Sequence, residues 1–441
     1  MKKRIIILTS LPFRKYGNQS LKRFVNMFLE KGFNVELFSS GSDSKGENIV
    51  HNLKFKKHRL PSLLETAINL KDDAKLPSCK ELKDKKSSNN LYQHIGSDTV
   101  LPPFGSNNIL SLIKAWVRFI LTRIDNLFAI FHLIFFKKGY IVNADAIIAY
   151  EIGYTFAAKI LSKLYKKKYI NKFQGVILKS TNRNINLCIK QYPENYFGLN
   201  KADLCIMVND GTDGLYYATI RGNTNIYFEP HGINNKEYEC FEKDPIKTNT
   251  FLKNVDREKF IIFNNASSSR WKRVDRIIRG LSLLDKNEHD KILFFTSYSG
   301  YDRHQLKELA VDLGVDEIVL FLDNIDHIQS NAILRESNVL AMTNDMSNLG
   351  NPVLEAIYYG IPTITIKDGS TEGFIKNNVD GYLIDLDDNF DTNFAKIISN
   401  LINNEDLYIS LKNNIRNNKS VNNLETQQTK EFEAIINIIQ V

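Results

Sequence analysis

A polar turn followed by a short helix is the part of this sequence that most strongly suggests chemistry. It lies in DMSNLGNPVLEAIYYGIPTITI, residues 345–366. Asn351 is a residue type that caps helix starts, and Pro352 suits the first helical position because its missing N–H costs nothing there. We expect the helix to run to Tyr359 and to end at Gly360, before the β-branched strand TITI.

The first turn of this expected helix could bind an anion. N–H groups without helical partners are expected around Val353 and Leu354, where the positive end of the helix dipole also lies. Glu355 stands at the same helix start. Two interpretations of its carboxylate stay open: it compensates the helix dipole, or it accepts hydrogen bonds from a ligand.

A second polar segment, SSSRWKRVDRII at residues 267–278, follows a predicted strand. Its small residues could pass close to phosphates, and Arg270, Lys272 and Arg273 could supply positive charge. Cations at a helix start are unfavourable for the dipole, so an anionic ligand is one explanation of this cluster. The alternative is a basic helix start that faces solvent.

Size and composition favour a two-domain protein with an anionic partner. The chain has 441 residues, a net charge of +8 and a pI near 9.0, which suits nucleotide phosphates or lipid headgroups. No Lys/Arg run with interleaved aromatic residues indicates nucleic acid. The 4 cysteines form no C-x-x-C pair and the 8 histidines no ligand motif, so we expect reduced thiols in a cytoplasmic protein and no bound metal.

The elements that must position these segments alternate between strands and helices. RIIILTS and NVELFSS flank an amphipathic segment, and FIIFNNA, KILFFTS, EIVLFLD, NVLAMT, TITI and GYLI supply strands further on. Such alternation predicts parallel sheets covered by helices. We expect, in order, a domain over residues 1–229 with a polar loop insert at 71–108, a linker over 230–256, a second domain over 257–420, and a helix over 421–441 that packs back on the first domain.

The long apolar stretch from Ile109 to Phe136 allows two interpretations. Lys114, Arg118 and Arg123 interrupt it, and a transmembrane span tolerates such charges poorly. We favour a buried helical layer of the first domain. The alternative is a helix that lies in a membrane interface, with its apolar side down and its cations at the headgroups.

Several segments occur in a recognisable order. SSSRWKRVDRIIRGL, LFFTSYSG, VLFLDNI, SNLGNPVLEAIYYGIPTI and EGFIKNNVDGYLID follow one another in the second half, after SLPFRKYGNQS, AYEIG and FQG in the first. This layout resembles the family 4 glycosyltransferases of the GT-B type over nearly the whole chain. The resemblance implies an α/β fold of two Rossmann-like parallel-sheet domains facing across a cleft.

The resemblance also implies roles for single residues. Glu355 matches the second Glu of the family's E-x(7)-E motif, which binds the ribose hydroxyls, and Lys272 matches the lysine that touches the diphosphate. Gly17 matches glycines that let the diphosphate-sugar approach the first domain. The loop from Leu322 to Ile325 matches the region that holds the base, and Glu151 lies where many members carry a His facing the sugar.

We therefore expect a catalytic set of Glu151, Lys272 and Glu355. The donor-binding set is larger, and it comprises Gly17, Arg270, Lys272, Leu322, Asn324, Ser347, Asn348, Leu349, Gly350, Asn351, Val353, Leu354 and Glu355.

Two positions depart from the family pattern. The first Glu of the motif falls at Ser347, which is not acidic, and Asp345 stands two residues earlier. The family's Arg, five residues before the Lys, falls at Ser267, whereas Arg270 sits closer to Lys272. The first departure concerns the donor sugar and the second concerns the diphosphate.

The expected reaction is transfer of a sugar from a nucleotide-diphosphate sugar to a hydroxyl acceptor, with retention and without a metal or other cofactor. A carbohydrate or lipid-linked glycan acceptor in bacterial surface polysaccharide or glycolipid synthesis would suit the basic first domain. The protein would then be cytoplasmic, at the inner face of an anionic membrane. Two alternatives are a non-catalytic GT-B subunit that binds nucleotide and a GT-B nucleotide-sugar epimerase.

Overall fold

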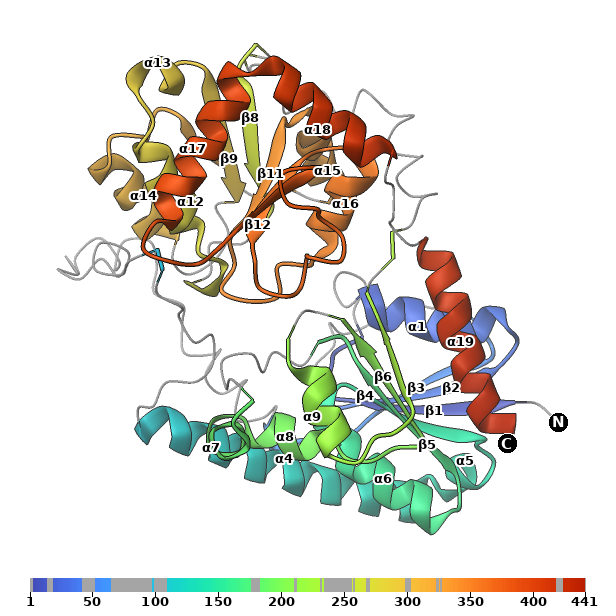
Figure 1. Cartoon of the computed structure of the whole chain (residues 1–441). Helices are drawn as coiled ribbons and strands as arrows, with labels where there is room; N and C mark the ends of the chain where they lie inside the picture. The colour runs from blue at the N-terminus through green and yellow to red at the C-terminus, as the bar shows by residue number, and fades with distance from the viewer. Residues whose placement is uncertain are drawn as a thin grey trace. The chain divides into compact units, whose positions relative to one another are not determined.

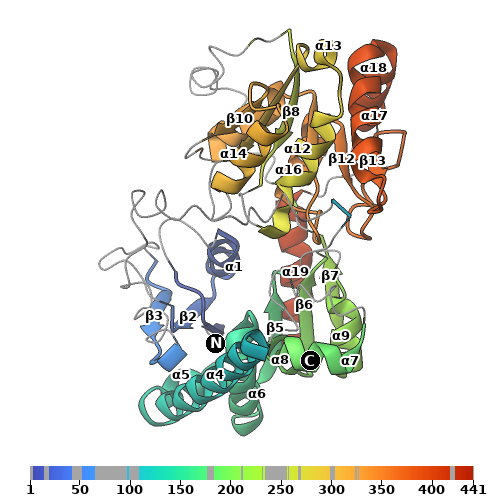
Figure 2. The same ribbon diagram turned by 90° about the vertical axis from the view of Figure 1, so that its left-hand side faces the viewer.

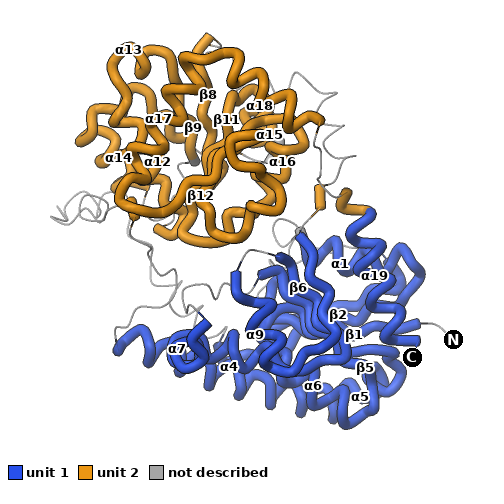
Figure 3. Tube along the Cα trace, viewed as in Figure 1, with its two compact units in different colours: residues 1–85, 104–230, 426–441 blue, residues 86–103, 231–425 orange. Residues whose placement is uncertain are grey.

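The structure, a computed structural model, forms two compact units. Unit 1 comprises residues 1–85, 104–230 and 426–441, and unit 2 comprises residues 86–103 and 231–425 (Figure 3). The structure describes residues 3–13, 19–41, 52–64, 97–98, 109–175, 183–209, 212–230, 232–233, 256, 258–266, 270–297, 303–322, 325, 327–417 and 423–440. Of the predicted insert at 71–108, only Ser97 and Asp98 lie within the described residues.

Within its described residues, unit 1 is built on a sheet of seven parallel strands in the order β3-β2-β1-β4-β5-β6-β7. The predicted apolar runs RIIILTS and NVELFSS form two of these strands, because alternate residues can be buried against helices on both faces. The strands are β1 Arg4–Thr9, β2 Asn34–Ser39, β3 Phe55–Arg59, β4 Ala146–Tyr150, β5 Lys168–Phe173, β6 Leu204–Val208 and β7 Ile226–Glu229.

Helices cover both faces of this sheet (Figure 1). One face packs against α1 Gln19–Glu30 and α19 Leu424–Gln440, where Phe432 of α19 contacts the ring of Phe28 at 5.8 Å. The other face packs against a larger group, made of α4 Ile109–Phe136, α5 Lys138–Val142, α6 Thr155–Leu164, α7 Ile185–Gln191, α8 Pro193–Gly198 and α9 Gly214–Ile220.

Unit 2 has a sheet of six parallel strands, in the order β10-β9-β8-β11-β12-β13, in the part of the chain that the structure describes. These strands are β8 Phe260–Asn264, β9 Ile292–Ser297, β10 Val319–Leu322, β11 Val339–Met342, β12 Thr363–Ile366 and β13 Gly381–Ile384. The prediction of two parallel-sheet α/β domains is confirmed by this pairing.

The helices of unit 2 also lie on both faces of its sheet (Figure 2). One apolar core includes α12 Val274–Ser282, α14 Arg303–Asp312 and α17 Phe390–Asn403. The opposite core includes α15 His327–Glu336, α16 Asn351–Tyr359 and α18 Glu405–Asn417. Two short elements complete the unit, the 3₁₀ turn η3 Arg270–Lys272 and α13 Lys286–His289.

The prediction of a buried helical layer over Ile109–Phe136 is wrong in one respect. These residues do form one helix, α4, which packs on unit 1. However, its buried residues form only one side, and large apolar residues on its other side are exposed. The helix is also the one described helix that is long and apolar enough to cross a membrane.

Candidate functional site

The strand order of each sheet indicates where a ligand would bind. In unit 2, β8, β9 and β10 run to one side and β11, β12 and β13 to the other, so the order reverses between β8 and β11. Open parallel sheets bind ligands at the carboxyl ends of strands, at the point where the order reverses. The connection after β8 carries Arg270 and Lys272, and the connection after β11 carries residues 343–350. Both predicted polar segments therefore start at this point.

The loop after β11 is held by the side chain of Asn348, which is fully buried. Its Oδ1 accepts from the N–H of Asn344 at 2.9 Å, and its Nδ2 donates to the Asn344 carbonyl at 3.0 Å and to Asp368 Oδ2 at 2.9 Å. Asn348 was predicted to bind the donor, but its amide is occupied in shaping the loop. Ser347, which precedes it, has φ 55, a left-handed conformation that non-glycine residues rarely adopt.

The backbone N–H groups of this turn also have partners in the protein. Leu349 N–H donates to Ser370 Oγ at 3.2 Å, and Gly350 N–H donates to the Asn348 carbonyl at 2.9 Å. Both N–H groups therefore donate within the protein.

The start of α16 differs from the prediction by one residue. Gly350, with φ −113 and ψ 174, is the N-cap, and Asn351 is already helical. Val353 and Leu354 N–H donate to the Gly350 carbonyl at 3.1 and 3.3 Å, so the prediction that they lack partners is wrong. The expected end of the helix is confirmed, because Gly360 is its C-cap with φ 72.

Glu355 lies in the second turn of α16, with 1% of its surface exposed. The first turn of the helix holds no acidic residue, so compensation of the dipole, which acts within the first turn, does not explain this carboxylate. Of the two interpretations of this carboxylate, acceptance of hydrogen bonds from a ligand is the one that stays a prediction.

Four residues that the resemblance assigns to the donor site have their side chains in the apolar core of unit 2. They pack in the apolar cluster under α15 and α16, and they are Leu322, Leu349, Val353 and Leu354. Any contact of theirs with a ligand would have to be through the backbone. Gly17 and Asn324 lie outside the described residues, as does Ser267.

The turn after β8 presents Lys272 without a salt bridge to any carboxylate of the described residues. Its Nζ lies 3.8 Å from the centroid of the Trp271 ring. Burial lowers the pKa of Lys272 to about 8, because removal from water disfavours the charged form. Arg270 in the same turn is exposed. A partly buried ammonium with this environment can be stabilised by a bound anion.

The neighbouring arginines are buried in a charge cluster that we did not predict. Arg273 donates through Nε and Nη2 to both oxygens of Asp275, each at 2.9 Å, and Arg276 Nη2 donates to Asp345 Oδ1 at 2.7 Å. Arg273 Nη1 lies 3.4 Å from the same Asp345 oxygen. All four side chains are 0% exposed. The predicted basic cluster thus divides into structural arginines and the cations of η3.

This buried charge cluster ties the two loops of the site together. Asp345 N–H donates to the Trp271 carbonyl at 2.9 Å, and Arg276 Nη1 donates to the Thr343 carbonyl at 2.7 Å. Arg276 Nε also donates to the carbonyl of Ser97 at 2.6 Å. The turn that holds Lys272 and the loop that leads to Glu355 are therefore fixed against each other.

In unit 1 the strand order reverses between β1 and β4, and Glu151 directly follows β4. It has φ 67 and ψ 171, a strained conformation of the kind found at functional sites. Its Oε1 accepts from Gln174 N–H at 2.8 Å. A Cβ on Gly153 would lie 2.6 Å from Ser10 Oγ, so the segments after β1 and β4 are in close contact.

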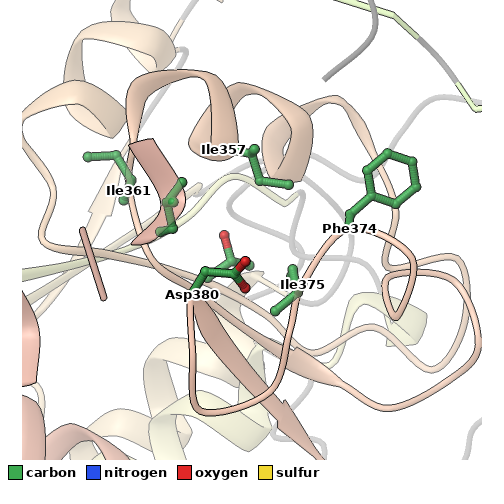
Figure 4. Close-up of a pocket in the computed structure, with 7 residues that line it drawn as sticks. Ile357, Ile361, Phe374, Ile375 and Asp380 are labelled. Carbon is green, nitrogen blue, oxygen red and sulfur yellow. The ribbon is translucent and has the colours of Figure 1, made fainter. Parts of the chain in front are cut away.

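A pocket in unit 2 lies elsewhere (Figure 4). It is lined mainly by apolar side chains together with Asp380, whose carboxylate accepts from Lys376 N–H at 2.6 Å. None of the predicted site residues lines it. Within the described residues no group of three or more His, Cys, Asp or Glu side chains is placed to hold a metal ion.

Comparison with known proteins gives a family-model match within unit 2. Residues 246–418 match the model described as glycosyl transferases group 1. The chain is 22% identical over 212 residues to N-acetyl-alpha-D-glucosaminyl L-malate synthase of Bacillus anthracis, a match that covers 48% of this chain and 53% of that protein. It is 23% identical over 372 residues to the uncharacterized glycosyltransferase MJ1069 of Methanocaldococcus jannaschii, covering 82% and 88%.

Solved structures share the fold of the whole chain. Alr3699/HepE of Anabaena, solved in complex with UDP, aligns with a TM-score of 0.65 and 12% identity over 99% of this chain and 100% of that one. WaaG, a glycosyltransferase involved in lipopolysaccharide biosynthesis, aligns with a TM-score of 0.61 and 13% identity over 98% and 99%.

The fold and the matched domain together define the class. The chain has the GT-B fold of glycosyltransferases, which confirms the predicted fold class. Residues 246–418, within its second unit, match the model described as glycosyl transferases group 1.

Proposed function

We propose that the chain transfers a sugar from a nucleotide-diphosphate sugar to a hydroxyl acceptor, in the manner of the family 4 enzymes and with retention at the anomeric carbon. The observation that carries the proposal is the pair of residues at the strand-order reversal of unit 2. Lys272, a partly buried cation, follows β8, and Glu355, a buried carboxylate, follows β11. A cation and a carboxylate suit a diphosphate and a ribose respectively.

In the reaction, the bond between the anomeric carbon and the diphosphate oxygen breaks, and the diphosphate leaves with the electron pair. The acceptor oxygen bonds to the same carbon and gives its proton to an oxygen of the departing diphosphate. Lys272 and the exposed Arg270 would stabilise the negative charge that develops on the diphosphate, since fixed cations act strongly where charge appears in the transition state. Glu355 would hold the ribose, and Glu151 would face the sugar from the segment after β4.

The names of the relatives support this proposal without defining the substrates. Alr3699/HepE was solved with UDP and glucose and also with UDP-glucose. A uridine nucleotide is therefore our first choice of donor. The acceptor class is proposed to be a carbohydrate or a lipid-linked glycan, as the expected surface polysaccharide role requires.

A panel of nucleotide sugars tests the reaction. The purified protein is incubated with UDP-, GDP- and ADP-sugars, with and without hydroxyl acceptors, and products are followed by NMR at the anomeric proton. We expect donor hydrolysis or transfer with retention, and full activity in EDTA, because side-chain cations supply the charge. Nucleotide binding without turnover would favour the non-catalytic subunit, which the neutral Ser347 suggests. Conversion of free donor to its epimer would favour the epimerase.

The affinity for a nucleoside diphosphate should fall as pH rises through the pKa of Lys272. That pKa is about 8 in the ligand-free protein. An anion binds the protonated ammonium and raises its pKa, so binding is tightest below pH 8 and weakens by up to about tenfold per pH unit above it. Isothermal titration with UDP, from about pH 7 to about pH 9, measures the change.

Two variants control this titration. Lys272→Ala should bind UDP more weakly by about 1–3 kcal/mol and lose the decline. Lys272→Arg keeps its charge throughout and should bind without the decline. If Lys272→Ala binds with unchanged affinity, Lys272 does not belong to the diphosphate site.

A further inference from the structure

The polarity of α4 is inverted relative to a helix of a water-soluble domain. Its buried residues include Thr122, Asp125 and Asn126, all polar, beside only Ala129 and Leu133. In an ordinary surface helix the apolar stripe faces the core and the polar side faces water. Here polar groups lie inside, and the exposed side needs an explanation.

The buried polar groups hold α4 on unit 1. The Asp125 carboxylate accepts from Ser62 Oγ at 2.5 Å and from Leu63 N–H at 2.7 Å. Asn126 Nδ2 donates to the Gly153 carbonyl at 2.7 Å, and its Oδ1 accepts from Ala157 N–H at 2.8 Å. Buried, fully bonded side chains of this kind fix orientation. The helix is therefore held with its opposite side turned outward, along the edge of unit 1 (Figure 2).

The outward side is a continuous apolar stripe. At about 100° per residue, its members fall within an arc of about 120°, opposite the buried residues. We call these ten exposed residues the α4 stripe: Ile109, Leu110, Ile113, Trp116, Val117, Ile120, Leu127, Phe128, Phe131 and Phe135. Monomeric soluble proteins rarely expose a contiguous apolar surface of this extent, and such a surface marks an interaction site.

The exposed charged residues of α4 beside the stripe are all basic. Lys114 is exposed, and so is Arg118, whose Nε lies 3.1 Å from Glu194 Oε2 of α8. Arg123 lies over the ring of Phe119 at 4.7 Å, and Lys138 follows the helix. The sole acidic residue of α4 is Asp125, which is buried. Basic side chains beside a stripe of Trp, Phe, Leu and Ile are the pattern of helices that lie in the headgroup region of anionic membranes.

Two other occupants fit less well. A transmembrane span would require lipid on every side of α4, whereas Asp125 and Asn126 bind unit 1 through its inner side. A second copy of the chain would bring two equally basic patches together, since a symmetric contact uses the same patch on both copies. An anionic lipid surface can take up the apolar stripe and can also pair with the basic side chains beside it.

We propose that α4 docks unit 1 on the surface of an anionic membrane, with the α4 stripe inserted among the acyl chains and Lys114, Arg118 and Lys138 at the headgroups. The helix lies in the plane of the membrane and stays bound to the protein through its polar side. This docking is independent of the reaction proposed above, although a lipid-linked acceptor would be reached from such a position.

Vesicle flotation tests the proposal with the full chain. Vesicles of neutral phosphatidylcholine are compared with vesicles that contain phosphatidylglycerol. We expect binding to the anionic vesicles, weaker binding to neutral ones, and release from the anionic vesicles as salt is raised. The double variant Ile120→Glu/Phe131→Glu should lower the vesicle partition coefficient by at least about tenfold, because it places two carboxylates in the acyl region.

A matched variant controls for the loss of exposed apolar surface. Leu283→Glu/Val311→Glu changes two residues of unit 2 that are 56% and 55% exposed, against 53% and 55% for Ile120 and Phe131. It should bind vesicles as the unchanged protein does. The proposal is overturned if the unchanged protein does not bind anionic vesicles, or if the α4 variant binds them as the unchanged protein does. Light scattering that shows a dimer dissociated by the α4 variant, without vesicle binding, would assign the stripe to a second copy.

Discussion

Replacing Asp345 with alanine should lower the free energy of unfolding of unit 2 by about 3–5 kcal/mol. The side chains of Arg273, Arg276, Asp275 and Asp345 are all 0% exposed, and their formal charges cancel. Without Asp345, the guanidinium of Arg276 stays buried and loses its carboxylate partner at 2.7 Å. Burial already lowers the pKa of Arg276 to about 10, which shows how strongly the site disfavours its charge.

Urea unfolding followed by tryptophan fluorescence measures this loss. The chain has two tryptophans, and Trp116→Phe leaves Trp271, whose carbonyl accepts from Asp345 N–H, as the reporter beside the cluster. Asp345→Asn keeps an acceptor oxygen and should lose less. Asp385→Ala is the control, because Asp385 is 71% exposed and pairs with Lys367 at 3.7 Å; it should cost about 0–1 kcal/mol. A comparable loss in both alanine variants would contradict the assigned role of the buried cluster.

The strands of both sheets could be predicted because each buried strand is a short apolar run between turns. Two examples are RIIILT and ILFFTS, which form β1 and β9. β3 was missed since its residues, FKKHR, are polar and mostly outside the core. It belongs to the sheet through backbone pairing with β2, and it is an edge strand among the described residues. Such pairing leaves no hydrophobic pattern in the sequence.

The site was predictable in its location but less so in its details. Glu355 and Lys272 do follow the strands at the order reversal, as the resemblance implies. The cap of α16 was misplaced because Asn before Pro usually starts a helix, whereas here the loop held by Asn348 turns one residue earlier. The buried cluster gave no sign in the sequence, since Arg276 pairs with Asp345, which is 69 residues away. Such long-range pairing cannot be read from local pattern.

Glu355→Ala should damage catalysis more than Ser347→Ala does. Glu355 is a buried carboxylate in α16 and is proposed to accept from the ribose hydroxyls. Losing a charged acceptor costs about 1.5–3 kcal/mol, a reduction of roughly 10- to 150-fold in kcat/KM. Ser347 is partly exposed in the preceding loop and offers one neutral hydroxyl. Its loss should cost about 0.5–1.5 kcal/mol, or roughly two- to tenfold.

The comparison uses kcat/KM for both variants with the donor that the panel identifies. Glu355→Gln keeps the size of the side chain and separates the loss of charge from the cavity that alanine leaves in a buried position. If Gln retains full activity, the carboxylate charge is not used. Ser347→Glu restores the acid that the family pattern has at this position, and a change of preferred donor sugar in this variant would place residue 347 against the sugar. Equal damage from Ser347→Ala and Glu355→Ala would give the hydroxyl a larger role than one neutral hydrogen bond.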